Sequence, residues 1–225
     1  MRWQDEYAAE RARMVEEQIR ARHIEDPLVL AAMLAVPRHR FVPPELRVRA
    51  YEDRPLPIGA GQTISQPYIV ALMTALLHLS GGEVVLEVGT GSGYQAAVLA
   101  RLCSVVHTVE QYPELARRAQ QILSELSVTN VRVHTGDGSL GWPAAAPYQG
   151  ILVTAAAPEV PPALLDQLDD GGRLVIPVGA RGDQKLQVWR RIGDHFRMKS
   201  LGLVSFVPLR GLYGWTDREW REEID

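Results

Sequence analysis

A glycine-rich loop carries the clearest chemical pattern in the chain. It reads Glu87-Val88-Gly89-Thr90-Gly91-Ser92-Gly93 and follows an apolar run that begins at Val84. Glycines accept positive φ and let a ligand approach the backbone, and the end of a first strand is where open α/β sheets bind ligands. The third glycine of the dinucleotide fingerprint G-x-G-x-x-G would fall on Tyr94, which disfavours a nicotinamide cofactor. No Gly-Lys-Ser/Thr follows, so the loop is not a P-loop.

Acidic residues at strand ends point to the kind of ligand. Glu110 lies 17 residues after Gly93, where a carboxylate can accept hydrogen bonds from both hydroxyls of a ribose. Asp137 ends a third apolar run and could hold an adenine amino group, while Glu87 would lie near the cationic, amino-acid end of the ligand. Three acids and no lysine in the loop favour the sulfonium of S-adenosylmethionine over a phosphate. The alternatives are a ligand-free turn, a solvated Glu110 and a turn-capping Asp137.

The elements around the loop alternate between strand and helix. Alternation of this kind predicts parallel strands with both faces of the sheet covered. Gly193-Asp194 separates two late strands and indicates a hairpin. We therefore expect an α/β fold whose sheet of about seven strands is mostly parallel with an antiparallel edge. The expected strands are 84–88, 105–109, 131–134, 151–153, 174–178, 185–192 and 196–207, with helices at 95–102, 115–126 and 163–168.

The first 80 residues predict a helical elaboration on this sheet. We expect helices at 8–22 and 28–36, the second capped by Asp26, and a buried helix at 69–79. Residues 43–67 contain five prolines and predict a long irregular segment with a functional role. A capping box at Thr216–Glu219 predicts a short final helix. The chain is thus expected to be one domain, with parts at 1–80, 81–210 and 211–225.

Composition excludes several classes of protein. The 225 residues are 46% hydrophobic and carry a net charge of −3, which lacks the basic footprint of a nucleic-acid-binding protein. The single cysteine, Cys103, excludes an intramolecular disulfide and is expected to be a buried thiol. The longest apolar run, 69–79, is too short to span a bilayer, and residues 1–26 lack an export signal. We expect a soluble cytoplasmic monomer with no bound metal and no nucleic-acid or membrane partner.

Further motifs are distributed along the chain. They are Val36-Pro37-Arg38, Phe41-Val42-Pro43, Ala50-Tyr51, Pro55-Leu56-Pro57-Ile58-Gly59, Gly61-Gln62-Thr63-Ile64-Ser65-Gln66-Pro67-Tyr68, Gly136-Asp137-Gly138 and Thr154-Ala155-Ala156-Ala157-Pro158. With these motifs the sequence resembles the protein-L-isoaspartate O-methyltransferases over roughly residues 12–209. The glycine loop is common to many methyltransferases, whereas GQTISQPY is specific to this family. Residues 1–11 lie outside the resemblance, and no family contact is assigned to the segment 210–215.

The resemblance implies a fold, a reaction and a set of site residues. It implies a class I methyltransferase that uses S-adenosylmethionine to methylate the α-carboxylate of isoaspartyl residues in ageing proteins, whose ester then collapses to a succinimide. Ser65 is carried over as the active-site serine. Substrate is expected at Ile58, Ser65, Ala156 and Ala157. The cofactor is expected at Gln62, Thr63, Ile64, Glu87, Gly89, Thr90, Gly91, Ser92, Gly93, Glu110, Gln111, Asp137 and Gly138.

The chemistry needs no general base. The substrate carboxylate is already ionised at pH 7, so the enzyme has only to position this group and remove water from it. We therefore interpret Ser65 as a hydrogen-bonding residue rather than a covalent nucleophile, with a helix N-cap as its structural alternative. The six histidines form no motif with a serine or with each other. An RNA or small-molecule methyltransferase and a non-catalytic module with the same fold remain rival functions.

Overall fold

A computed structural model describes residues 6–222, with side chains to residue 220. The chain starts with α1 (Ala8–Arg13), which continues through a π-helical turn at Met14–Ile19 and a 3₁₀ turn at Arg20–Arg22. Helix α2 (Pro27–Ala35) begins after Asp26, whose carboxylate accepts hydrogen bonds from Leu28 N and Val29 N at 2.9 and 3.3 Å. The predicted N-terminal helices and the Asp26 cap are confirmed. Among the described residues, no helix is long and apolar enough to cross a lipid bilayer.

The segment expected to be irregular contains regular structure. Two 3₁₀ segments, Arg38–Phe41 and Pro44–Arg49, precede an antiparallel ribbon of β1 (Leu56–Gly59) and β2 (Gln62–Ile64). The expectation of a long irregular loop was therefore wrong at β1 and β2. Prolines on either side of Leu56 hide the first strand in the sequence, because proline is depleted in strands.

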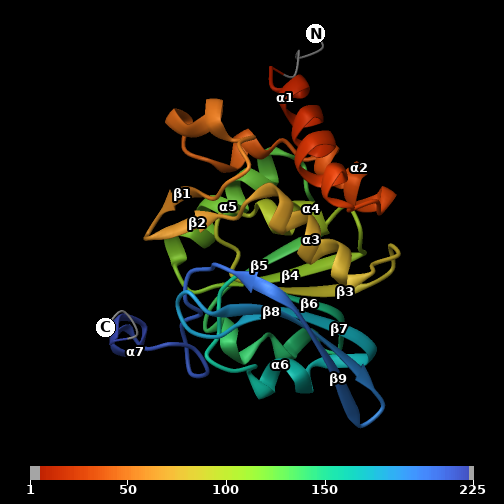
Figure 1. Ribbon diagram of the computed structural model, residues 1–225, viewed down its shortest axis with the longest axis vertical. Helices are drawn as coiled ribbons and strands as arrows, with labels where there is room; N and C mark the ends of the chain where they lie inside the picture. Colours follow the sequence, from red (N-terminus) through yellow and green to blue (C-terminus); the bar gives the residue numbers. More distant parts are fainter. Residues whose placement is uncertain (1–5, 223–225) are drawn as a thin grey trace.

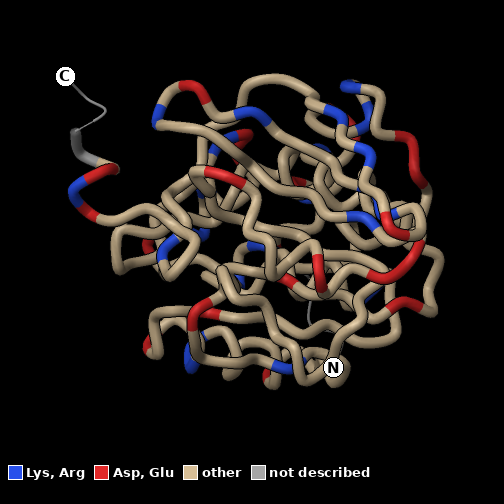
Figure 2. The backbone as a smooth tube through the Cα atoms, turned by 90° about the horizontal axis from the view of Figure 1, so that it is seen from below, with Lys and Arg blue, Asp and Glu red and all other residues tan. Residues whose placement is uncertain are grey.

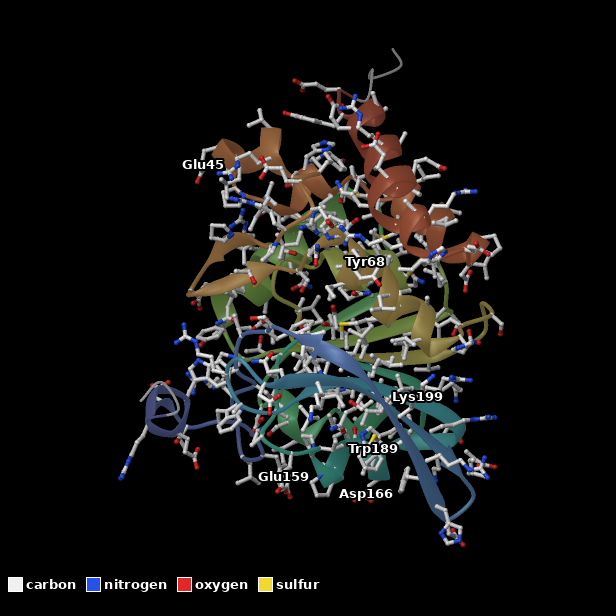
Figure 3. The ribbon with its side chains drawn as sticks, viewed as in Figure 1. Glu45, Tyr68, Glu159, Asp166, Trp189 and Lys199 are labelled. Atoms are coloured by element: carbon white, nitrogen blue, oxygen red, sulfur yellow. The ribbon has the colours of Figure 1, made fainter. Side chains whose placement is uncertain are left out.

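Helix α3 (Pro67–Leu77) joins this region to the sheet and ends at His78, which adopts the left-handed conformation. Tyr68 on α3 lies between the N-terminal helices and the sheet, whereas Glu45 lies at the periphery (Figure 3). The Arg22 guanidinium lies 4.8 Å from the centroid of the Tyr68 ring. Helix α3 also contacts α2 on one side and strands of the sheet on the other, so it lies between the N-terminal elaboration and the sheet.

The second half of the chain forms a seven-stranded sheet in the order β5-β4-β3-β6-β7-β8-β9. Strands β3 to β7 are parallel, and β8 and β9 add an antiparallel edge, as predicted. Across this edge the register sets Arg173 opposite Arg190, and Arg190 opposite Arg197. The strands are β3 (Val84–Val88), β4 (Val105–Glu110), β5 (Val131–Thr135), β6 (Tyr148–Val153), β7 (Leu168–Val178), β8 (Gln184–Ile192) and β9 (His195–Val204).

Helices cover both faces of the sheet (Figure 1). On one side lie α3, α4 (Tyr94–Leu99) and α5 (Pro113–Glu125), with the N-terminal helices beyond them; α6 (Pro162–Asp166) covers the other. Each face of the sheet packs into its own hydrophobic core. Alternate residues of β6 point to opposite faces, so Leu152 belongs to the first core and Ile151 and Val153 belong to the second. Trp189 on β8 packs against the second core (Figure 3). Because each face is buried, the parallel strands read as nearly continuous apolar runs.

The chain ends in α7 (Asp217–Glu222), which stands out from the body in Figure 2. Thr216 N donates to the Glu219 carboxylate at 2.9 Å, and Glu219 N donates to Thr216 Oγ1 at 3.2 Å, so the predicted capping box is confirmed. Acidic and basic residues are interspersed along the chain in the same view (Figure 2). Cys103 is buried, as expected.

Candidate active site

The glycine loop follows β3, and its glycines adopt positive φ values that residues with side chains rarely adopt. Gly89 has φ of 96°, and a Cβ there would lie 2.3 Å from Thr154 Oγ1. That hydroxyl donates a 2.7 Å hydrogen bond to the Gly89 carbonyl, so the loop is fastened to the residue after β6. Gly91 has φ of 52° and lies on the wall of a cavity at the carboxyl ends of β3 and β4. The loop thus presents bare backbone to that cavity.

Most of the predicted cofactor residues line this cavity. They come from four segments of the chain, which the parallel sheet and the β1–β2 ribbon bring together: β2, the glycine loop, the end of β4 and the residues after β5. Strand-end positions predicted the glycine loop and the ends of β4 and β5, whereas Gln62–Ile64 were expected from the family resemblance. The predicted residues on the wall are Gln62, Thr63, Ile64, Ser65, Gly89, Thr90, Gly91, Ser92, Glu110, Gln111 and Gly138.

Glu110 connects the end of β4 to the loop. Its carboxylate accepts hydrogen bonds from Gly91 N at 2.7 Å and from Tyr112 N at 3.0 Å. The residue is only 5% exposed, yet it lines the cavity. A carboxylate offers about four acceptor positions, so two remain for ligand hydroxyl groups. This geometry suits the ribose role that the sequence predicts for Glu110.

Glu87 lies beneath the loop rather than in the cavity. It is fully buried, accepts a 2.5 Å hydrogen bond from Thr108 Oγ1, and Thr108 in turn contacts Thr90 Oγ1 at 2.6 Å. Burial raises the pKa of Glu87 from 4.5 to about 8, so the carboxyl group is neutral at pH 7. Glu87 therefore supports the loop from below as a neutral acid, and the cofactor contact expected of it stays a prediction.

Asp137 also lies outside the cavity lining. Its carboxylate accepts hydrogen bonds from Ser139 N and Oγ, at 2.9 and 2.7 Å, and from Leu212 N at 2.8 Å. The chain passes so close at Gly211 that a Cβ there would lie 1.9 Å from Asp137 Oδ1. Asp137 therefore caps a turn and anchors the C-terminal segment, and the adenine contact expected of it stays a prediction. Its neighbour Gly138 lines the cavity.

The residues expected to bind substrate divide in the same way. Ile58 is buried, and its side chain would be 3.4 Å from a Cβ at Gly91, so it supports the loop. Ala156 N donates to Val207 O, and Ala157 N donates to Pro177 O, at 2.8 and 3.0 Å. Both amides are used within the fold, and the substrate contacts expected of Ile58, Ala156 and Ala157 stay predictions. Gly93 likewise packs against Ala119 of α5.

Ser65 occupies a distinctive place. It follows β2, while the N-cap position of α3 belongs to Gln66, so the N-cap alternative for Ser65 was wrong. Ser65 lines the first cavity and also a second, wider cavity of about 740 Å³. The Ser65 carbonyl accepts a 2.7 Å hydrogen bond from the guanidinium of the buried Arg38. The shared wall of the two cavities consists of Thr63, Ser65, Thr154, Val207 and Pro208.

Sequence reasoning missed part of both walls. Thr154, Ala155 and the segment Val207–Arg210 line the first cavity, and Arg181 and Trp220 line the second. The run Phe206-Val207-Pro208-Leu209 after the last strand is apolar, a pattern that could have indicated a buried wall. Nothing in the sequence marks Arg181 or Trp220. The missed lining of the first cavity is completed by Val70, Val88, Tyr94, Gln95, Val109 and Tyr112.

Two histidines associate contrary to expectation. His107 Nδ1 and His134 Nε2 are 3.0 Å apart, the two rings are nearly parallel, and Trp142 stacks on His134 at 3.9 Å. Burial lowers the pKa of both histidines, so the pair is neutral at pH 7. Neither histidine lines the cavities described above. Within residues 6–222, no group of three or more His, Cys, Asp or Glu side chains could hold a metal ion.

A mostly parallel seven-stranded sheet with a glycine loop and an acid at the ends of its first two strands defines a class I methyltransferase. The model of the family "Protein-L-isoaspartate(D-aspartate) O-methyltransferase (PCMT)" matches residues 9–213. The chain belongs to this family. The predicted family, fold and enzyme class are confirmed, together with S-adenosylmethionine, the methyl donor of the family.

Relatives cover nearly the whole chain. A protein-L-isoaspartate O-methyltransferase from Pelotomaculum thermopropionicum is 56% identical over 214 residues, 95% of this chain and 93% of the relative. One from Methanoregula boonei is 56% identical over 206 residues, 92% and 95% of the two chains. A solved structure named protein-L-isoaspartate O-methyltransferase has a TM-score of 0.81 at 28% identity, and the match covers 90% of this chain and 67% of that one.

Proposed function

We propose that this chain methylates the α-carboxylate of L-isoaspartyl residues in damaged proteins and peptides, and so starts their repair through a succinimide. The observation that best supports this function is the wall common to the two cavities, where Thr63, Ser65 and Thr154 line both. A methyl donor in the first cavity and a polypeptide in the second would meet at these residues. The wider cavity suits a polypeptide segment, since it is open and lined mainly by apolar and hydroxyl side chains.

The lining of the first cavity supports the proposal that S-adenosylmethionine binds there. Bare backbone at Gly89 and Gly91 leaves room for a ligand, and Glu110 keeps acceptor positions for ribose hydroxyls. Arg210, a basic residue on this wall, is already engaged with Asp217 and the Trp215 carbonyl, at 2.7 and 2.8 Å. When bound, the cofactor supplies an electrophilic methyl group on a positively charged sulfur. The residues proposed to hold it are the lining residues Gln62–Ile64, Gly89–Ser92, Glu110, Gln111 and Gly138.

The chain's own contribution to the reaction is orientation and the exclusion of water. A carboxylate oxygen of the substrate forms the new O–C bond while the electron pair of the broken C–S bond returns to sulfur. The anionic oxygen and the cationic sulfur both become neutral, so a dry site favours the transfer. Ser65 is proposed to hydrogen-bond the carboxylate in line with the methyl group, because the substrate is ionised at pH 7 and needs no base.

The proposal extends to the domain organisation, partners, oligomeric state and location of the protein. We infer a single domain, and the first core supports this, since it joins Met33 of α2 with Val85 of β3. The interspersed charges in Figure 2 support an enzyme without a nucleic-acid partner. We also propose that the protein is a monomer and that it acts in the cytoplasm.

The test is methyl transfer from labelled S-adenosylmethionine to a short isoaspartyl peptide, with the matching aspartyl peptide as control. We expect label on the isoaspartyl peptide alone, as a base-labile ester. Label on neither peptide, with cofactor still bound, would overturn the proposed substrate. Label on both peptides equally would overturn the proposed selectivity.

A further inference from the structure

Arg38 is a buried cation in an unusual setting. Its side chain is completely inaccessible to solvent, and it forms no ion pair with any Asp or Glu among the residues the structure describes. Burial lowers the pKa of Arg38 to about 10, so the guanidinium stays charged at neutral pH. A buried charge without a counterion costs several kcal/mol. A fold that keeps this charge therefore uses the guanidinium for something that an apolar side chain could not provide.

The guanidinium links three separate segments. Its Nε donates a 2.7 Å hydrogen bond to the carbonyl of Ala50, and Nη2 donates a 2.7 Å hydrogen bond to the carbonyl of Ser65. Its Cζ lies 4.9 Å from the centroid of the Tyr94 ring, a cation–π contact. Two bonds from one planar group at fixed angles are a geometric constraint that a lysine cannot reproduce.

Two of the three segments form opposite parts of the proposed site. Ser65 lies on the wall between the two cavities, where the substrate carboxylate is expected. Tyr94 is the first residue of α4, directly after the glycine loop, and it lines the cofactor cavity. Phe41 packs edge-on against the Tyr94 ring at 5.5 Å, so the 3₁₀ turn of Arg38 contacts Tyr94 twice. Arg38 therefore spans from the substrate side of the site to the cofactor side.

We propose that Arg38 is a positioning residue for methyl transfer, whose guanidinium sets the distance between Ser65 and the helix behind the cofactor loop. This inference rests on the proposed function, since it needs a carboxylate at Ser65 and a methyl donor at the loop. A misplacement of about 1 Å between reacting groups can cost roughly 100-fold in rate. The glycine loop keeps its own anchors at Thr154 and Glu110, so loss of Arg38 disturbs the alignment of the two substrates more than cofactor binding.

The experiment compares Arg38→Met, Arg38→Lys and Arg40→Met with the wild-type chain. Arg40 lies in the same 3₁₀ turn but is partly exposed and pairs with Glu125 at 2.8 Å, so its variant is a matched surface control. For each protein, kcat and KM are measured with the isoaspartyl peptide, the Kd of S-adenosylhomocysteine by calorimetry and Tm by circular dichroism. We expect Arg38→Met to lower kcat by about 10- to 100-fold, with Kd within about threefold of wild type. Arg38→Lys keeps the charge but not the two-armed geometry, and so recovers only part of kcat.

A chemical rescue separates positioning from general support of the fold. In Arg38→Ala, guanidinium at tens of millimolar is expected to restore kcat several-fold, whereas sodium chloride at equal ionic strength does not. Unchanged kcat in Arg38→Met would overturn the inference, as would a rise in Kd together with a fall in Tm and kcat and no rescue. If the wild-type chain is active and Arg38→Met equally so, only this inference fails. If the wild-type chain labels no isoaspartyl peptide, the proposed function fails and this inference with it.

Discussion

The Glu110 carboxylate and the Gly91 amide are joined by a 2.7 Å hydrogen bond that fastens the glycine loop to the end of β4. One side chain thus shapes the loop and faces the cavity that the loop encloses. Removing it should therefore affect the cofactor twice, through a lost ribose contact and through a loosened loop.

Glu110→Ala is expected to weaken binding of S-adenosylhomocysteine at least tenfold, the scale of a lost charge-assisted hydrogen bond of about 1.5–3 kcal/mol. Titration calorimetry measures this directly. Glu114→Ala, an exposed acid in the first turn of α5, is the control and should bind as wild type does. An unchanged Kd for Glu110→Ala would disprove its ribose role.

Ser65→Ala is expected to lower kcat with the isoaspartyl peptide while leaving the Kd of S-adenosylhomocysteine close to that of wild type. The reason is that Ser65 lies on the substrate wall of the cofactor cavity rather than under the loop. Ser200→Ala on β9 is the matched control, since that serine is exposed on the edge strand. Mass spectrometry of quenched wild-type reactions should find neither an O-methyl ether nor an acyl ester on Ser65; such an adduct would show that Ser65 is a nucleophile instead.

Gly89→Ala is expected to destabilise the fold by more than the strain of a positive φ, which is about 1–3 kcal/mol, because the new Cβ would also meet Thr154 Oγ1 at 2.3 Å. Gly171→Ala isolates the strain, since Gly171 has φ of 77° with no atom within 4 Å of a Cβ. Urea unfolding of both variants gives the difference. Equal losses of stability would mean that the loop shifts away from Thr154 without penalty.

The pKa of Glu87, raised from 4.5 to about 8 by burial, predicts a pH-dependent stability. Below pH 4.5 the carboxyl group is protonated in both folded and unfolded chains, so ionisation of Glu87 does not reduce the free energy of unfolding. As pH rises towards 8, only the unfolded chain ionises, so the free energy of unfolding falls by up to about 1.4 kcal/mol per pH unit and then levels off.

Glu87→Gln removes this titration while keeping a neutral side chain of similar shape. Urea unfolding between pH 5 and pH 9 should therefore show the wild-type chain losing stability relative to Glu87→Gln up to about pH 8. Parallel curves for the two proteins across this range would show that Glu87 is ionised in the folded chain.

The sheet could be predicted from the sequence because each parallel strand is buried on both faces. Runs such as Val84–Val88 and Ile151–Val153 are short, apolar and bounded by glycine or polar residues, which is typical of such strands. The β1–β2 ribbon could not be predicted in this way. Its strands have four and three residues, and prolines at 55 and 57 disguise the first.

The site was predicted as far as it depends on where strands end. Glu110 is the last residue of β4 and Gly138 follows β5, and both line the cavity because parallel strands bring their carboxyl ends to one edge. Asp137 and Ala156 have equally suitable positions, but partners distant in the sequence, Leu212 and Val207, take up their hydrogen bonds. Position on a strand is local information, whereas the partner of a polar group depends on a part of the chain that folds back from elsewhere.

The arginine row across β7, β8 and β9 ends at a strand with no neighbour on its outer side in the described sheet. A free edge of this kind invites pairing with another extended chain. A second copy that added its own β9 here would bring Arg197 and Lys199 beside the same cations of its neighbour, and like charges on adjacent strands repel. This repulsion opposes edge-to-edge aggregation of the sheet. Because the repulsion is electrostatic, concentrated salt would weaken it.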